Sequence, residues 1–144
     1  MTHEALLETL RLRIGETRGP FVRTIEAGAL IRFAAATGQT HPRYFDRNHG
    51  PVAAPTYIST FCAEAVAELI TLDPGLPMFL HSDDVAELGD PIIAGDEIRA
   101  TARYVDAFVR EGRRGTMLFQ TAEMRLVNQR NAHVATVRVS AVSF

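Results

Sequence analysis

The chain has 144 residues, of which 47% are hydrophobic and 22% are charged, and its formal net charge is -2 at pH 7. This length suits one domain over residues 1–144, and the charge argues against a nucleic-acid-binding protein. Neither a secretory signal pattern nor an apolar run of about 18 residues is present, so we expect a cytoplasmic protein that does not cross a membrane.

The first third of the chain predicts two helices and a strand. Leucines at helical spacing indicate a short amphipathic helix over residues 2–14, which ends at Gly15. A short strand is expected over residues 21–25, followed by a second helix that begins at Glu26. Gly38 stands where a helix C-cap belongs.

A polar loop is expected between this second helix and the next apolar segment. Residues 38–51, GQTHPRYFDRNHGP, are rich in glycine, proline, asparagine and basic residues. Polar and reactive side chains are concentrated here, so the loop is the first place to look for a site. His41 has a suitable pKa range for a catalytic base, but exposed loop histidines are usually inert.

Residues 52–72 predict a tight entry followed by one strongly apolar helix. Apolar residues recur in adjacent pairs every four positions and form one continuous stripe. Pro55 suits the first helical position, and residues 73–75 end the helix. Cys62 is the only cysteine, so no intramolecular disulfide is possible, and its place in the stripe indicates a packed thiol.

The remainder of the chain reads as antiparallel sheet. Strands are expected over residues 78–88, 97–110, 116–127 and 132–144, separated by turns at 89–91, 112–115 and 128–131. Such long strands should curve and wrap the apolar helix. The simplest architecture is therefore an α+β hotdog fold, a long antiparallel sheet around one central helix. Its exposed edge and face favour a dimer.

A second polar cluster lies on the first of these strands. Alternation places His81 and Asp83 on one face, where they would form a histidine and carboxylate pair. The pair is a candidate acid and base. The alternative is an exposed strand whose negative charges discourage edge pairing. The five histidines show no metal-ligand spacing, so we expect neither a metal nor a cofactor.

The order of four segments, FAAATG, QTHPRYFD, APTYISTF and PIIAGDEI, resembles the MaoC-like hydratases and dehydratases, closest to the branch of FAS1-like dehydratase domains. The resemblance runs from Leu12 to Val142. It implies a hotdog fold that acts on thioesters of coenzyme A or acyl carrier protein. The implied reaction is the reversible addition of water to a trans-2-enoyl thioester, which needs a base, an acid and donors to the developing enolate oxygen.

The catalytic loop of this family reads glycine, aspartate, any residue, asparagine, proline, any residue, histidine. Here Gly38 and Pro42 match, but Gln39 stands at the aspartate position and Tyr44 at the histidine position. His41 replaces the asparagine. The chain is therefore similar to the non-catalytic, substrate-holding A-type subunit of (3R)-hydroxyacyl-carrier-protein dehydratases, which works with a catalytic MaoC-like chain.

The entrance to the central helix departs from the family as well. Catalytic members place histidine and glycine there, whereas this chain has Ala54 and Pro55, and proline has no N–H to donate. The N–H of Thr56 or Tyr57 remains available. The resemblance thus implies four substrate-binding candidates: Gln39, Tyr44, Thr56 and Tyr57.

Several functions stay open on the sequence. The favoured one is a substrate-holding subunit that forms a heterodimer with a MaoC-like chain. The alternatives are a self-sufficient homodimeric hydratase that uses His41 or the His81 and Asp83 pair, a non-enzymatic acyl-ligand binding protein, and a hotdog thioesterase. Arginines 110, 113 and 114 at a hairpin tip would either meet carrier protein or coenzyme A phosphates or belong to a solvated turn.

Overall fold

The computed structural model describes residues 2–70, 75–113 and 115–144. Five strands form one antiparallel sheet with the order β1-β3-β4-β5-β2. The strands are β1 (Thr17–Thr24), β2 (Phe79–Leu88), β3 (Glu97–Gly112), β4 (Gly115–Val127) and β5 (His133–Ser143). The helices are α1 (His3–Arg11), α2 (Ala27–Ala36), α3 (Cys62–Ala65) and the 3₁₀ helices η1 (Pro42–Tyr44) and η2 (Pro55–Phe61).

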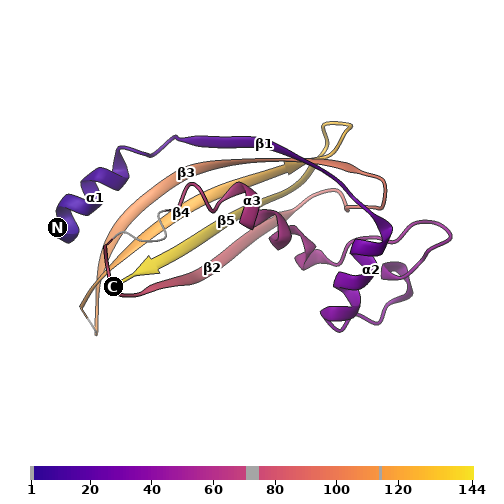
Figure 1. Ribbon diagram of the computed structural model, residues 1–144, viewed down its shortest axis with the longest axis horizontal. Coiled ribbons are helices and arrows are strands. Elements are labelled where there is room, and N and C mark those ends of the chain that lie inside the picture. The colour runs from indigo at the N-terminus through magenta and orange to yellow at the C-terminus, as the bar shows by residue number, and fades with distance from the viewer. Residues whose placement is uncertain (1, 71–74, 114) are drawn as a thin grey trace.

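The sheet curves around the segment that carries η2 and α3, which lies across its concave side (Figure 1). Alternate residues of β3, β4 and β5 point to this side and are buried, as period-2 patterning requires. The core includes Tyr57, Phe61 and Leu69 from the crossing segment and Met124 and Val137 from the sheet. The expected hotdog fold is confirmed.

Four expected strands are present within a few residues of their predicted ends. β1 differs, because it begins at Thr17 and includes Gly19 and Pro20, which read as a break in the sequence. An edge strand tolerates both residues. The pairing of β1 with β3 shifts between Arg18 and Phe21, and Gly19 adopts a φ of +94° there. A bulge therefore lets β1 begin before the expected start at residue 21.

The helix expected after the entry, from Pro55 onward, begins where predicted but is wrong in its regularity. Residues 52–54 are extended, η2 is a 3₁₀ helix of 7 residues, and α3 is an α-helix of only 4 residues. The Thr60 hydroxyl donates to the Tyr57 carbonyl at 2.8 Å, a local bond that competes with regular α-helical pairing. The apolar stripe is nevertheless buried along its length, from Tyr57 to Ile70. Residues 71–74, which include most of the expected helix stop, lie outside the described residues.

The two N-terminal helices lie at opposite ends of the sheet (Figure 1). In α1, Thr2 is the N-cap, and Leu6, Leu7 and Leu10 are buried, which confirms the amphipathic helix. In α2, Leu30 and Ala34 are buried, and Gly38 follows with a φ of +74°, as expected near a helix C-terminus. No helix in the described part of the chain is long and apolar enough to cross a membrane.

Candidate functional site

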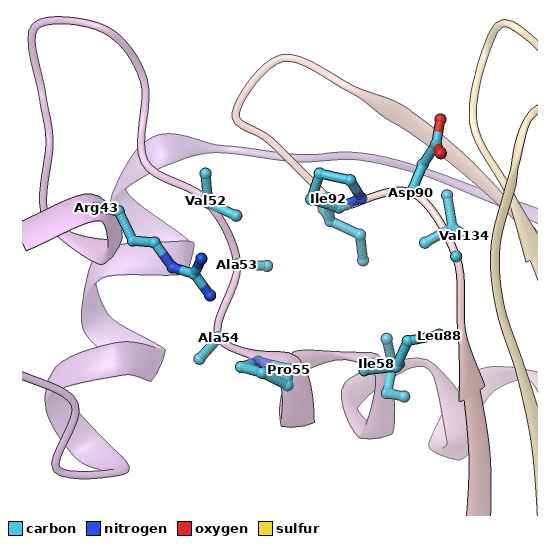
Figure 2. Close-up of a pocket in the computed structure, with 12 residues that line it drawn as sticks. Arg43, Val52, Ala53, Ala54, Pro55, Ile58, Leu88, Asp90, Ile92 and Val134 are labelled. Carbon is cyan, nitrogen blue, oxygen red and sulfur yellow. The ribbon is translucent and has the colours of Figure 1, made fainter. Parts of the chain in front are cut away.

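A pocket of about 180 Å³ lies where the chain enters η2 (Figure 2). We name it the Arg43 pocket. One wall is the extended segment 52–55 with Ile58, and the other is the segment 88–92 with Val134. The walls are mostly apolar, and Arg43 and Asp90 are the two charged side chains on them. A mostly apolar hollow with a few polar groups is typical of a small-molecule site.

Backbone hydrogen bonds fix the two walls against each other. The N–H of Ala53 donates to the carbonyl of Ile92 at 2.8 Å, and Val52 forms an isolated bridge with Ile93. The buried carboxylate of Asp96 accepts from the N–H of Ile93 at 3.0 Å and from Gln129 Nε2 at 2.9 Å. Asp96 therefore holds the turn that carries one wall, which gives the PIIAGDEI segment a structural role.

Arg43 is held by three contacts although its side chain is exposed. Its N–H donates to His41 Nδ1 at 3.2 Å, and its carbonyl accepts from the N–H of Val52 at 3.1 Å. Its Nη2 donates to the Tyr44 phenol oxygen at 2.8 Å, with the guanidinium 4.8 Å from the centre of the Tyr44 ring. The guanidinium is therefore pre-positioned at the pocket.

A second hollow, of about 210 Å³, lies farther along the same side of the sheet. We name it the Cys62 pocket. Its lining is apolar apart from Cys62 and His81, and it comes from α3, the turns after it, β2 and β5: Cys62, Ala63, Val66, Ala67, Ile70, Phe79, His81, Val139 and Ala141. Such a surface suits an apolar chain.

An ion-pair geometry lies at the edge of the Cys62 pocket. His81 Nε2 is 2.7 Å from Asp84 Oδ1, and the two side chains are 60% and 30% exposed. Burial, and to a lesser degree the charge of Asp84, raises the pKa of the half-buried Cys62 thiol to about 11. A thiol in this state is protonated near neutral pH and is a poor nucleophile.

The sequence matches the family model described as FAS1-like, dehydratase domain region, over residues 13–137. The chain belongs to the FAS1-like dehydratase domain family. A search of curated proteins found no match.

Several solved structures share the fold of this chain. A C-terminally truncated HadBC complex, a (3R)-hydroxyacyl-ACP dehydratase from Mycobacterium tuberculosis, aligns with a TM-score of 0.74 and 16% identity, covering 91% of this chain and 97% of that chain. The R-hydratase PhaJ1 from Pseudomonas aeruginosa aligns with a TM-score of 0.68 and 16% identity, covering 90% and 81%. The ChsH1-ChsH2 complex from Mycobacterium tuberculosis aligns with a TM-score of 0.68 and 15% identity, covering 91% and 98%.

The residues at the family's catalytic loop positions take structural places here. Tyr44 is 7% exposed, packs with Ala34 and Ala54, and its phenol oxygen accepts from Arg43. Gln39 donates its backbone N–H to the Ala34 carbonyl at the end of α2, and neither pocket is lined by its side chain. His41 caps η1 through Nδ1.

The expected backbone donors of η2 are reduced to one. Pro55 has no N–H, and the N–H of Tyr57 donates to the Ala54 carbonyl at 2.9 Å. The Tyr57 ring is buried edge-on against Phe33, with 5.2 Å between ring centroids. Thr56 is exposed, and of the two expected backbone donors, Thr56 and Tyr57, the N–H of Thr56 is the one that remains a candidate.

The prediction that His81 and Asp83 share a face is wrong. The pairing of β2 with β5 shifts between these residues, so that His81 lies opposite Ala141 but Asp83 lies opposite Ser140. The extra residue, Ser82, moves Asp83 to the outer face of the sheet, where it accepts from the Ser82 hydroxyl at 2.9 Å. The carboxylate that joins His81 is Asp84.

Of the hairpin arginines that the structure describes, Arg110 and Arg113 line neither pocket. Arg110 lies over the stacked rings of Phe108 and Phe119, at 5.6 and 5.7 Å from their centroids. Arg113 is exposed, and residue 114 lies outside the described residues. Among the described residues, no group of three or more histidine, cysteine, aspartate or glutamate side chains is placed to hold a metal ion.

Sequence reasoning missed Arg43, Asp84 and Asp96 as members of these sites. Arg43 stands in the QTHPRYFD segment, and its place between the candidates His41 and Tyr44 could have marked it as a site residue. Asp84 depended on a bulge that alternation does not reveal. Asp96 follows Gly95, which has a φ of +90°, and this Gly-Asp pair is a readable turn signal.

Proposed function

We propose that this chain is the substrate-holding subunit of an acyl-thioester hydratase or dehydratase, and that a MaoC-like partner chain supplies the catalytic aspartate and histidine. The observation that carries the proposal is the Arg43 pocket beside a loop whose family catalytic positions hold Gln39 and Tyr44 in place of the aspartate and histidine. The loop's own imidazole and carboxylate pair, His49 and Asp46 at 3.0 Å, is exposed and lines neither pocket. Gln39 cannot exchange a proton near neutral pH, and the Tyr44 phenol is buried and bound by Arg43. The pocket is present, whereas the family's acid and base are replaced.

The edge strand β2 supports the need for a partner. It is the last strand in the sheet order, and nine of its ten residues are exposed. Leu80, Val85 and Leu88 are 45%, 64% and 56% exposed. Both pockets include residues of β2, so a chain paired to this edge would lie next to both. The HadBC and ChsH1-ChsH2 relatives are complexes of two named chains.

The test compares the purified chain alone with the chain co-expressed with a MaoC-like partner. We expect the chain alone to hydrate crotonyl-CoA at least about 100-fold more slowly than the complex, because a positioned acid or base contributes about that much. The measurement is the loss of enoyl-thioester absorbance, with the partner alone as the control. Hydration by the chain alone at the rate of the complex would contradict the proposal.

One observation favours a second function, a self-sufficient homodimeric hydratase. The His81 and Asp84 pair is 2.7 Å apart and lies at the apolar Cys62 pocket. On the leading proposal, His81→Ala in the complex leaves crotonyl-CoA hydration unchanged. A loss of turnover in His81→Ala, but not in the outer-face control Asp83→Asn, would favour the second function instead. Ligand binding without turnover in every combination would favour a non-enzymatic carrier.

A further inference from the structure

The walls of the Arg43 pocket have few backbone donors left for a ligand. The N–H groups of Val52, Ala53, Gly89 and Asp90 each donate to another backbone carbonyl. Pro55 and Pro91, which also line the pocket, have no N–H. A ligand oxygen that needs a donor here must therefore rely mainly on side chains.

Arg43 is the cationic side chain on this wall, and its guanidinium is held by the Tyr44 phenol oxygen. Within the part of the chain that the structure describes, no carboxylate lies at ion-pair distance from it, whereas Arg13, Arg23 and Arg138 are paired with glutamates. Figure 2 shows the Arg43 guanidinium beside Ala53 and Ala54, and the Asp90 carboxylate pointing away from it. The positive charge is therefore not neutralised within the chain.

We propose that Arg43 binds a negatively polarised oxygen of the acyl-thioester ligand at the mouth of the Arg43 pocket. Two oxygens of such a ligand have this chemistry, the thioester carbonyl and a phosphate of the coenzyme A arm. A guanidinium presents five donors in a fixed plane and suits either acceptor. The inference rests on the proposed function, because it assigns a residue to the binding of that ligand.

The test measures binding by calorimetry on the complex of the chain with its partner. The probes are butyryl-CoA, which is saturated and cannot be hydrated, and butyryl-pantetheine, which has the thioester but no phosphate. We expect Arg43→Gln to weaken butyryl-CoA binding about tenfold or more, the size of a lost charge-assisted hydrogen bond. Arg43→Lys should weaken it less, since the charge is kept. Arg47→Gln, on the same loop but outside the Arg43 pocket, is the control for net charge.

The second probe identifies the oxygen. If the carbonyl is bound, Arg43→Gln weakens butyryl-pantetheine as well; if a phosphate is bound, this probe binds wild type and variant equally. Equal butyryl-CoA affinity of wild type and Arg43→Gln, or an equal loss in Arg47→Gln, would overturn the assignment. Melting temperatures establish that the variants fold.

The two proposals fail in different ways. A complex that binds butyryl-CoA through Arg43 but does not hydrate crotonyl-CoA contradicts only the proposed function. A complex that does not bind butyryl-CoA contradicts both proposals.

Discussion

Gly89→Ala is expected to lower the free energy of unfolding by about 3 kcal/mol, the upper part of the range for overpacked sites. A Cβ at this position would overlap the His133 carbonyl oxygen and lie 2.6 Å from His133 Nδ1. The Gly89 N–H also donates to the Val134 carbonyl at 2.8 Å, so the two segments cannot separate without losing this bond. Urea denaturation followed by circular dichroism measures the change in midpoint.

Gly28→Ala is the matched control for this substitution. Gly28 lies within α2, and the nearest atom to an added Cβ is the end of the Arg32 side chain at 3.2 Å, which can move. Alanine favours the helix over glycine by about 1 kcal/mol, so this variant should be as stable as wild type or more stable. An unchanged midpoint for Gly89→Ala would show that the segment 88–90 is not packed on β5 as described.

The position of Gly89 explains why the Gly89→Ala substitution should also alter the Arg43 pocket. Leu88, Gly89 and Asp90 form one wall of the Arg43 pocket, and the close approach of Gly89 to His133 sets where that wall lies. A side chain at position 89 would move the wall and alter the pocket. Glycine is needed here for close approach between two chain segments and not for an unusual φ.

The sheet and the crossing segment were predictable because their patterns are long. Alternation over the 11 to 16 residues of β3, β4 and β5 leaves little choice of face. The apolar stripe from Tyr57 to Ile70 likewise fixed which side chains are buried. It did not fix the helix type, which depends on local hydrogen bonds such as that from the Thr60 hydroxyl to the Tyr57 carbonyl.

The candidate site was less predictable, because it depends on local irregularities. One extra residue in β2 exchanged Asp83 for Asp84 as the partner of His81. Arg43 is placed against the segment 52–55 by one hydrogen bond, from the Val52 N–H to the Arg43 carbonyl. No spacing in the sequence indicates this contact. The absence of an acid and base pair at Gln39 and Tyr44, in contrast, was readable from residue type alone.

Cys62 is expected to react with iodoacetamide about 100-fold more slowly at about pH 8 than an unperturbed thiol. The thiolate is the reacting species, and its fraction falls about tenfold for each unit by which the pKa exceeds 9.0, up to its value of about 11 in the fold. Burial is the larger cause, so Asp84→Asn should speed the reaction only in part. The chain unfolded in urea is the control, in which Cys62 reacts at the ordinary rate.

The same raised pKa predicts a loss of stability in alkali. A protonated thiol is favoured by the fold, so its contribution is fully present below pH 9 and is lost as the pH rises through about 11. Burial also raises the pKa of Tyr104 from 10.0 to about 12, which extends the loss to higher pH. Cys62→Ser removes the titrating thiol and leaves Tyr104, so its urea midpoint should fall less between about pH 9 and pH 11 than that of wild type. Ordinary reactivity of Cys62 in the folded chain would show that the thiol is open to water and that burial does not raise its pKa.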